Sequence, residues 1–134
     1  MKRCIMKYIL INGCYGGFSF SEDFMKTFEK MYPHYFEKDD WWDIDYFRRN
    51  EDVIQLYREK GQDWSSGKYS KLTLKEIPED VYDYVRVGEY DGYESMVIDW
   101  KKAFYKMYEL ENADEKDTLI QSLEAYEDND EIST

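Results

Sequence analysis

The chain has 134 residues, of which 30 are Asp or Glu and 18 are Lys or Arg, and its formal net charge at pH 7 is -12. This charge repels nucleic acid and anionic membranes at long range and favours basic partners. An aromatic share of 19%, with two prolines and seven glycines, excludes a low-complexity chain and indicates a folded domain. We expect no direct nucleic-acid binding and no membrane span, because no apolar run approaches the roughly 18 to 20 residues that a span requires.

The acidic residues are concentrated at the C-terminal end. Ten of them, against one lysine, lie between Glu109 and Thr134, so the first 108 residues are close to neutral. Two cysteines without a signal-peptide pattern favour a reducing compartment, and we expect a cytoplasmic protein. The distribution predicts one domain over residues 1–111 and an acidic, helical and frayed tail over residues 112–134.

A strand and a helix are expected near the start of the chain. Residues 5–11 are nearly all apolar, as in a short strand that is buried on both faces. Residues 20–31 carry apolar side chains at helical spacing, and Ser19 and Ser21 are competing N-caps for that helix. Pro33 ends the helical pattern.

The middle of the chain begins irregularly. Residues 34–47 mix aromatic side chains with carboxylates and follow no clean period, so we predict an irregular segment. A helix is predicted over residues 51–60, because Asn50 is a favourable N-cap and Gly61 a favourable end. Residues 69–77 alternate like a half-exposed strand.

A hairpin and further helices are expected in the second half. Strands over residues 81–90 and 93–98 flank Asp91 and Gly92, a dipeptide that suits a two-residue type I′ turn. A helix follows from Asp99, and a weaker one lies in the acidic tail. These elements predict an α+β fold with a small, mostly antiparallel sheet and a C-terminal hairpin, covered by two or more helices and extended by a C-terminal acidic helix.

The loop NGCYGGFSFS, which follows the first predicted strand, is the first candidate site. A strand, a glycine turn and a helix N-terminus in this order can hold an anion, because free N–H groups and the helix dipole point to one place. The loop lacks the P-loop lysine and the three-glycine dinucleotide spacing. Two interpretations stay open, namely a ligand-contacting loop and a structural turn in which Gly16 and Gly17 have positive φ.

Charged residues elsewhere are candidates for the same ligand. Arg48 and Arg49 precede a predicted helix, where two guanidinium groups can either bind a phosphate or carboxylate or balance neighbouring surface carboxylates. Lys71, in the second predicted strand, can complete a basic patch. Asp91 and Glu94 in EYDGYE belong either to a plain hairpin turn or to a set of hydrogen-bond acceptors for a ligand.

The sequence contains few residues that suit catalysis. His34 is the single histidine, so a nucleophile and base pair would have to join it to Cys14. One histidine and two cysteines reproduce no metal-ligand spacing, and the carboxylates of residues 39–45 lack the central glycine of a calcium loop. We assign no catalytic residue, no metal and no cofactor, and enzyme activity stays open.

Three stretches together resemble a family of small uncharacterised proteins of bacteriophages and large DNA viruses. They are NGCYGGFSFS, residues 48–81 and EYDGYE, and the family is typified by N-x-C-Y-G-G-F-x-x-S near the N-terminus and a later Y-D-G-x-E. The resemblance covers roughly residues 5–98 and implies a viral origin and a place in the host cell cytoplasm. It implies no reaction, because no activity is established for the family. Gly13 stands where a larger residue, often arginine, is common in the family.

Two functions from different classes follow. The first is a non-catalytic viral accessory protein, active in counter-defence, that holds a small anionic or nucleotide-like ligand at the CYGGF loop. The alternative is an acidic nucleic-acid mimic that inhibits a basic host defence protein. A homo-oligomer is compatible with both functions. The residues predicted to contact the ligand are Asn12, Tyr15, Gly16, Gly17, Phe18, Ser19, Arg48, Arg49, Lys71, Asp91 and Glu94.

Overall fold

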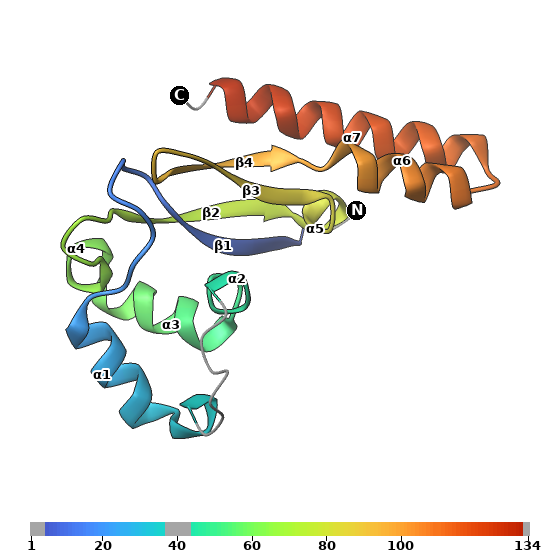
Figure 1. The fold of residues 1–134 in the computed structure, drawn as a ribbon. Coiled ribbons are helices and arrows are strands. Elements are labelled where there is room, and N and C mark those ends of the chain that lie inside the picture. Colours follow the sequence, from blue (N-terminus) through green and yellow to red (C-terminus); the bar gives the residue numbers. More distant parts are fainter. Residues whose placement is uncertain (1–4, 37–43, 133–134) are drawn as a thin grey trace. The chain divides into compact units, whose positions relative to one another are not determined.

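The computed structural model describes residues 5–36 and 44–132 and confirms the predicted α+β fold (Figure 1). The carboxylate-rich residues 37–43, part of the segment predicted to be irregular, lie outside the described residues. The elements are β1 (Met6–Asn12), α1 (Glu22–Met31), the 3-10 helix η1 (Pro33–Phe36), α2 (Ile44–Phe47), α3 (Glu51–Lys60), α4 (Gln62–Ser65), β2 (Leu72–Pro78), α5 (Glu79–Tyr82), β3 (Val85–Tyr90), β4 (Tyr93–Ile98), α6 (Trp100–Glu109) and α7 (Ala113–Ile132).

The four described strands pair two by two, β1 with β2 across a long helical connection and β3 with β4 across a tight turn. Among the described residues they form two two-stranded sheets, β1 with β2 and β3 with β4, where the sequence predicted one small sheet. The N–H of Gly13 donates to the carbonyl of Lys71 (2.8 Å) at one end of the first pair, and the N–H of Glu79 donates to the carbonyl of Ile5 (3.0 Å) at the other. This register makes β1 and β2 antiparallel.

Local capping signals set the helix boundaries. The Ser21 hydroxyl accepts a hydrogen bond from the N–H of Phe24 (2.9 Å), so Ser21 is the N-cap of α1 and Ser19 is not. The side chain of Asn50 caps α3, which ends at Gly61 with φ 87°. These boundaries agree with the prediction from the sequence because each depends on residues a few positions apart.

The hairpin between β3 and β4 has the predicted turn. Asp91 and Gly92 have φ values of 53° and 86°, the positive pair that a type I′ turn requires. The strand predicted over residues 81–90 is shorter, however, because α5 occupies Glu79–Tyr82 and β3 begins only at Val85. Pro78 ends β2, and the acidic side chains that follow it favour the first turn of a helix.

The chain divides into two compact units. The first, which we call the glycine-loop unit, consists of residues 8–76 and 89–95. The second, which we call the C-terminal unit, consists of residues 5–7, 77–88 and 96–132 of the described chain. Each unit is described separately below.

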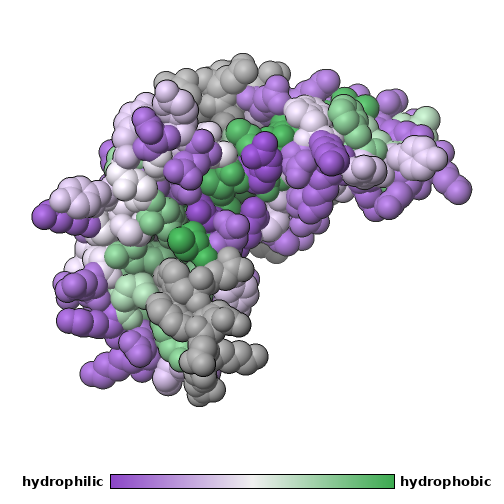
Figure 2. Space-filling model, viewed as in Figure 1, coloured by the Kyte–Doolittle hydropathy of each residue, from purple (hydrophilic) through white to green (hydrophobic). Residues whose placement is uncertain are grey.

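Apolar side chains from β1, α1, α2 and α3 form the core of the glycine-loop unit. Phe24 and Phe28 of α1 are fully buried, and their stacked rings have centroids 6.2 Å apart. The ring of Phe47 meets that of Phe28 edge to face, with centroids 6.1 Å apart. Burying a side chain of this size contributes roughly 1.5 to 3 kcal/mol. On the surface shown in Figure 2, hydrophobic side chains appear as separate patches among hydrophilic ones. The buried cluster comprises Leu10, Phe24, Phe28, Phe47, Val53, Ile54 and Leu56.

The C-terminal unit contains the segment predicted as a frayed tail. Helix α7 extends over 20 residues and packs on α5, and its Leu123 is fully buried. The Nε1 of Trp100 also donates to a carboxylate oxygen of Glu127 (3.3 Å). Residues 112–132 are therefore part of a folded unit. No helix in the described part of the chain is long and apolar enough to cross a membrane.

Candidate functional site

Asn12, at the end of β1, is fully buried, and its side chain connects three parts of the glycine-loop unit. Its amide nitrogen donates to the carbonyl oxygens of Cys14 (2.6 Å) and Gly92 (2.7 Å). Its amide oxygen accepts from the backbone N–H of Lys71 (2.8 Å) and from the Cys14 thiol (3.4 Å). The amide thus uses both donors and both acceptor positions inside the protein, and it has no hydrogen-bonding capacity left for a ligand.

Gly16 and Gly92 allow three backbone segments to approach one another closely. A Cβ on Gly16 would overlap the backbone carbonyl of Tyr69, and a Cβ on Gly92 would lie 2.7 Å from the nitrogen of Gly17 and 2.8 Å from the carbonyl oxygen of Tyr15. Gly17 itself has φ 94°, a conformation that glycine adopts without steric cost. The loop is therefore held by backbone contacts with Tyr69 and with the hairpin turn.

Arg48 and Glu94 form a buried ion pair in the same unit. Nη1 and Nη2 of Arg48 each lie 3.0 Å from one carboxylate oxygen of Glu94. Nε of Arg48 lies 3.3 Å from an oxygen of Asp45 but makes no hydrogen bond to it. Because the Asp45 side chain is 84% exposed, water screens its charge, and Glu94 is the stronger partner of Arg48. The ring of Phe18 covers the guanidinium at 4.5 Å. The charge of Arg48 is thus engaged within the protein.

Arg48 and Glu94 also provide hydrogen-bond partners for the edge of β1 that faces away from β2. The N–H of Leu10 donates to the carbonyl of Arg48 (2.9 Å), and the carbonyl of Leu10 accepts from Nη1 of Arg48 (3.2 Å). The N–H of Asn12 donates to Oε1 of Glu94 (2.8 Å). Buried backbone groups need such partners, and β1 finds them in one backbone carbonyl and two side chains, where another strand would otherwise pair.

Exposed tyrosines lie around the loop. Tyr15 of the loop and Tyr93 of β4 are 69% and 42% exposed, with ring centroids 5.2 Å apart and planes tilted by 40°. Tyr90 pairs with Tyr93 across the two-residue turn, and cross-strand neighbours share one face of a hairpin. Tyr69 is also exposed, and its carbonyl contacts Gly16. We call Tyr15, Tyr69, Tyr90 and Tyr93 the tyrosine surface.

Two lysines border the tyrosine surface. Nζ of Lys68 lies 5.3 Å from the centre of the Tyr69 ring. Lys71 has an exposed side chain, and its backbone is fixed next to the loop by the hydrogen bond from its N–H to Asn12. Aromatic rings beside ammonium groups suit a flat ligand that carries negative charge.

The structure places all the predicted site residues in one unit but gives them different surroundings. Arg48 and Glu94, predicted to face a ligand, bind each other. Ser19 is also engaged, because its carbonyl accepts from the N–H of Gly67 (3.0 Å) and the hydroxyl of Ser70 (2.7 Å). The exposed members are Tyr15, Gly16, Ser19, Lys71 and Asp91; Gly17, Phe18 and Arg49 are half-buried; and Asn12, Arg48 and Glu94 are buried.

Sequence reasoning did not include the aromatic side chains that complete this surface. Tyr90 and Tyr93 flank the predicted hairpin turn, so their common face could have been derived from the two-residue turn. The position of Tyr69 had no such signal, because it depends on a close backbone contact with Gly16, which is 53 residues earlier in the chain.

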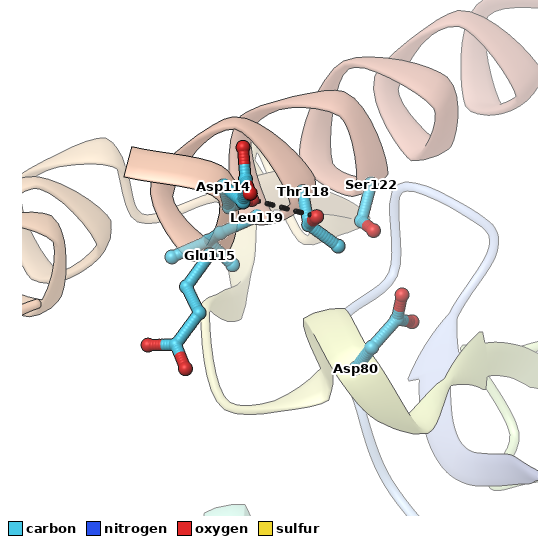
Figure 3. A pocket seen from close by; sticks show the side chains of 6 residues that line it. All are labelled: Asp80, Asp114, Glu115, Thr118, Leu119 and Ser122. Atoms are coloured by element: carbon cyan, nitrogen blue, oxygen red, sulfur yellow. Dashed lines mark hydrogen bonds between the residues drawn. The ribbon is translucent and has the colours of Figure 1, made fainter. Parts of the chain in front are cut away.

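A separate hollow of about 330 Å³ lies in the C-terminal unit, between α5 and the first turns of α7 (Figure 3). The hydroxyl of Thr118 on this hollow donates to the carbonyl of Asp114 (2.8 Å). Three carboxylates around one hollow repel anions, so a nucleotide-like ligand is not expected here. The lining residues are Asp80, Asp114, Glu115, Thr118, Leu119 and Ser122.

Fold and site together define an α+β protein with a loop held by close backbone contacts and hydrogen bonds, and with an exposed aromatic surface. Comparison of the chain with protein-family models, with curated proteins and with solved structures finds no match. The resemblance of the CYGGF and YDGYE motifs to small viral proteins therefore stays a prediction. Within residues 5–36 and 44–132, no group of three or more His, Cys, Asp or Glu side chains is arranged to hold a metal ion.

Proposed function

We propose that the chain is a non-catalytic binding protein that holds a small anionic, nucleotide-like ligand on the tyrosine surface. The observation that carries the proposal is the pair of exposed rings, Tyr15 and Tyr93, which lie 5.2 Å apart. Exposed aromatic rings on a fixed backbone offer a large contact area at a low cost in conformational entropy. The glycine contacts and the Asn12 hydrogen bonds supply that fixed backbone.

Lys68 and Lys71 are the residues that we expect to balance the negative charge of the ligand. The sequence pointed to Arg48 and Arg49, but the guanidinium of Arg48 is bound to Glu94 and covered by Phe18. Both lysine side chains are exposed, Nζ of Lys68 lies beside the Tyr69 ring, and the backbone of Lys71 is bonded to Asn12 at the start of the loop. A base stacked on a tyrosine ring, with its phosphate toward a lysine, matches this arrangement.

The motif resemblance supports a biological setting for this binding. A viral protein in the host cell cytoplasm that sequesters a nucleotide-like signal would act in counter-defence. This role rests on the CYGGF and YDGYE motifs, whereas the binding itself rests on the tyrosine surface.

Calorimetric titration with three probes tests the binding. AMP carries both a base and a phosphate, adenosine lacks the phosphate, and ribose 5-phosphate lacks the base. We expect AMP to bind best, and Tyr15→Ala to weaken AMP binding by about 1 to 3 kcal/mol, the usual contribution of one stacked base. Lys71→Ala should weaken the binding of AMP but not that of adenosine.

Tyr105→Ala is the matched control, because Tyr105 is 65% exposed but lies in the C-terminal unit. AMP should bind this variant as it binds the parent protein. Equal affinities of the parent and Tyr15→Ala for AMP, or no heat from any of the three probes, would contradict the proposal.

The acidic helix α7 favours the second candidate function, inhibition of a basic host protein by imitation of nucleic acid. Asp114, Glu115, Asp117, Glu124 and Glu127 have exposed side chains along this helix. Competition with duplex DNA for a basic DNA-binding protein, followed by fluorescence anisotropy, tests the idea. Neutral Asn and Gln at these five positions should abolish competition and leave AMP binding unchanged, which separates the two functions.

A further inference from the structure

Helix α6 of the C-terminal unit exposes an aromatic stripe. Phe104, Tyr105 and Tyr108 are 60%, 65% and 89% exposed, and together with Lys101 they line a shallow apolar hollow of about 600 Å³. These four residues are spaced i, i+3, i+4 and i+7, which places them on one face of a helix. Large exposed apolar patches of this kind mark interaction sites.

The opposite face of α6 is buried. Ala103 is fully buried and Met107 nearly so. Trp100, at the start of the helix, contacts the ring of Phe104 at 5.9 Å and donates to Glu127 of α7. The aromatic stripe is therefore not needed for the packing of α6 on the rest of the C-terminal unit.

We propose that the aromatic stripe of α6 binds the same stripe of a second copy of the chain, with the two helices antiparallel about a two-fold axis. The spacing of the four residues is symmetric about its midpoint, so the stripe is complementary to itself, as an isologous contact requires. Phe104 of one copy then meets Tyr105 of the other, and Lys101 meets Tyr108.

Charge complementarity favours a second copy over an anionic partner. Antiparallel pairing brings Lys101 of one copy beside Glu109 of the other, so opposite charges meet at both ends of the contact. Residues 77–88 and 96–127 contain five Lys or Arg and eleven Asp or Glu, and three of the five basic residues lie on α6. A unit with this excess of carboxylates repels nucleic acid and anionic lipid.

Sedimentation equilibrium of the full chain over a range of concentrations tests the proposal. We expect a reversible monomer and dimer equilibrium in the parent protein. Lys101→Glu and Glu109→Lys should each raise the dimer dissociation constant by about tenfold, because each places like charges opposite one another. The double variant restores opposite charges at both ends and should return the dissociation constant to that of the parent.

Controls separate this contact from a general charge effect and from unfolding. Lys26→Glu changes an exposed lysine of α1 in the glycine-loop unit and should leave the dimer unchanged. Circular dichroism should show that every variant keeps its helices, since the substituted side chains are exposed. A parent protein that stays monomeric at all concentrations, or a double variant as weak as the single ones, would overturn the proposal, as would monomer binding to anionic vesicles through α6.

Discussion

Arg48 and Glu94, which are 46 positions apart in the chain, meet as a buried ion pair with two contacts of 3.0 Å. Arg48 directly follows α2, and Glu94 lies in β4, so the pair connects the helical part of the glycine-loop unit to the hairpin. Because Leu10 and Asn12 of β1 also bond to this pair, one ionic contact holds three segments together.

Arg48→Ala should destabilise the protein by about 3 to 5 kcal/mol, because it leaves the buried carboxylate of Glu94 without its countercharge. The measurement is urea-induced unfolding followed by circular dichroism. Arg86→Ala, which removes an exposed arginine, should change the free energy of unfolding by less than about 0.5 kcal/mol. Similar values for the two variants would show that the Arg48 pair contributes no more than a surface charge.

Replacing both Arg48 and Glu94 by apolar residues separates the effect of an unpaired buried charge on stability from the effect of lost side-chain volume. Arg48→Met with Glu94→Leu should cost less than Arg48→Ala alone, because no unpaired charge remains buried. Some loss should persist, since the N–H of Asn12 and the carbonyl of Leu10 lose their partners. A double variant that is less stable than Arg48→Ala would contradict this reasoning.

Gly16→Ala should destabilise the protein by about 1 to 3 kcal/mol, because the new methyl group overlaps the backbone carbonyl of Tyr69. Gly13→Ala is the control, since its methyl group would meet the Thr73 hydroxyl at 3.1 Å, which belongs to a side chain that can move. Thermal or urea unfolding measures both variants. We expect the Gly16 variant to be clearly the less stable of the two.

Truncation after Glu111 should destabilise the C-terminal unit, because it removes α7 and the buried Leu123. Leu123→Ala tests the contact without deletion and should cost about 2 to 5 kcal/mol. Leu119→Ala, at a half-buried position on the same helix, should cost less. A truncated chain that unfolds in urea like the parent would show that α7 is only an appendage.

Stability should fall in alkaline solution as the half-buried tyrosines Tyr57 and Tyr84 ionise. Burial raises the pKa of the Tyr57 hydroxyl above its ordinary value of about 10, and burial together with the charges of Asp83 and Glu109 does the same for the pKa of Tyr84. The folded state therefore keeps these protons at a pH where the unfolded chain has lost them. The free energy of unfolding is unaffected by these groups below about pH 10 and decreases as the pH rises through their raised pKa values.

Urea unfolding measured from about pH 9 to about pH 11 checks this dependence. The free energy of unfolding of Tyr57→Phe should decrease less steeply with pH than that of the parent, since the variant lacks one of the groups with a raised pKa. The Tyr57 hydroxyl donates to the carbonyl of Leu72 (2.9 Å), which also accepts from Gln62, so the variant should remain folded. A decrease for Tyr57→Phe as steep as that of the parent would contradict this reasoning.

Local elements of the fold follow from the sequence because their causes are local. The Asn50 cap, the Gly61 end of α3 and the Asp91-Gly92 turn each depend on residues within a few positions, and each lies where the pattern predicted it. The strand predicted over residues 81–90 was partly wrong, because the residues after Pro78 start a short helix. An apolar pattern alone does not separate these alternatives over four residues.

The surroundings of the candidate site residues were decided by contacts between distant segments. Whether Arg48 faces a ligand or a carboxylate depends on Glu94, and nothing in the residues next to either side chain records that pairing. Asn12 likewise bonds to Lys71 and Gly92, which are 59 and 80 positions away. The sequence by itself determined the elements, their caps and the glycine turn, whereas the tertiary structure decided which polar groups are buried against one another and which tyrosines remain exposed. The physical reason is that a buried charge or amide must find its partners wherever the folded chain brings them.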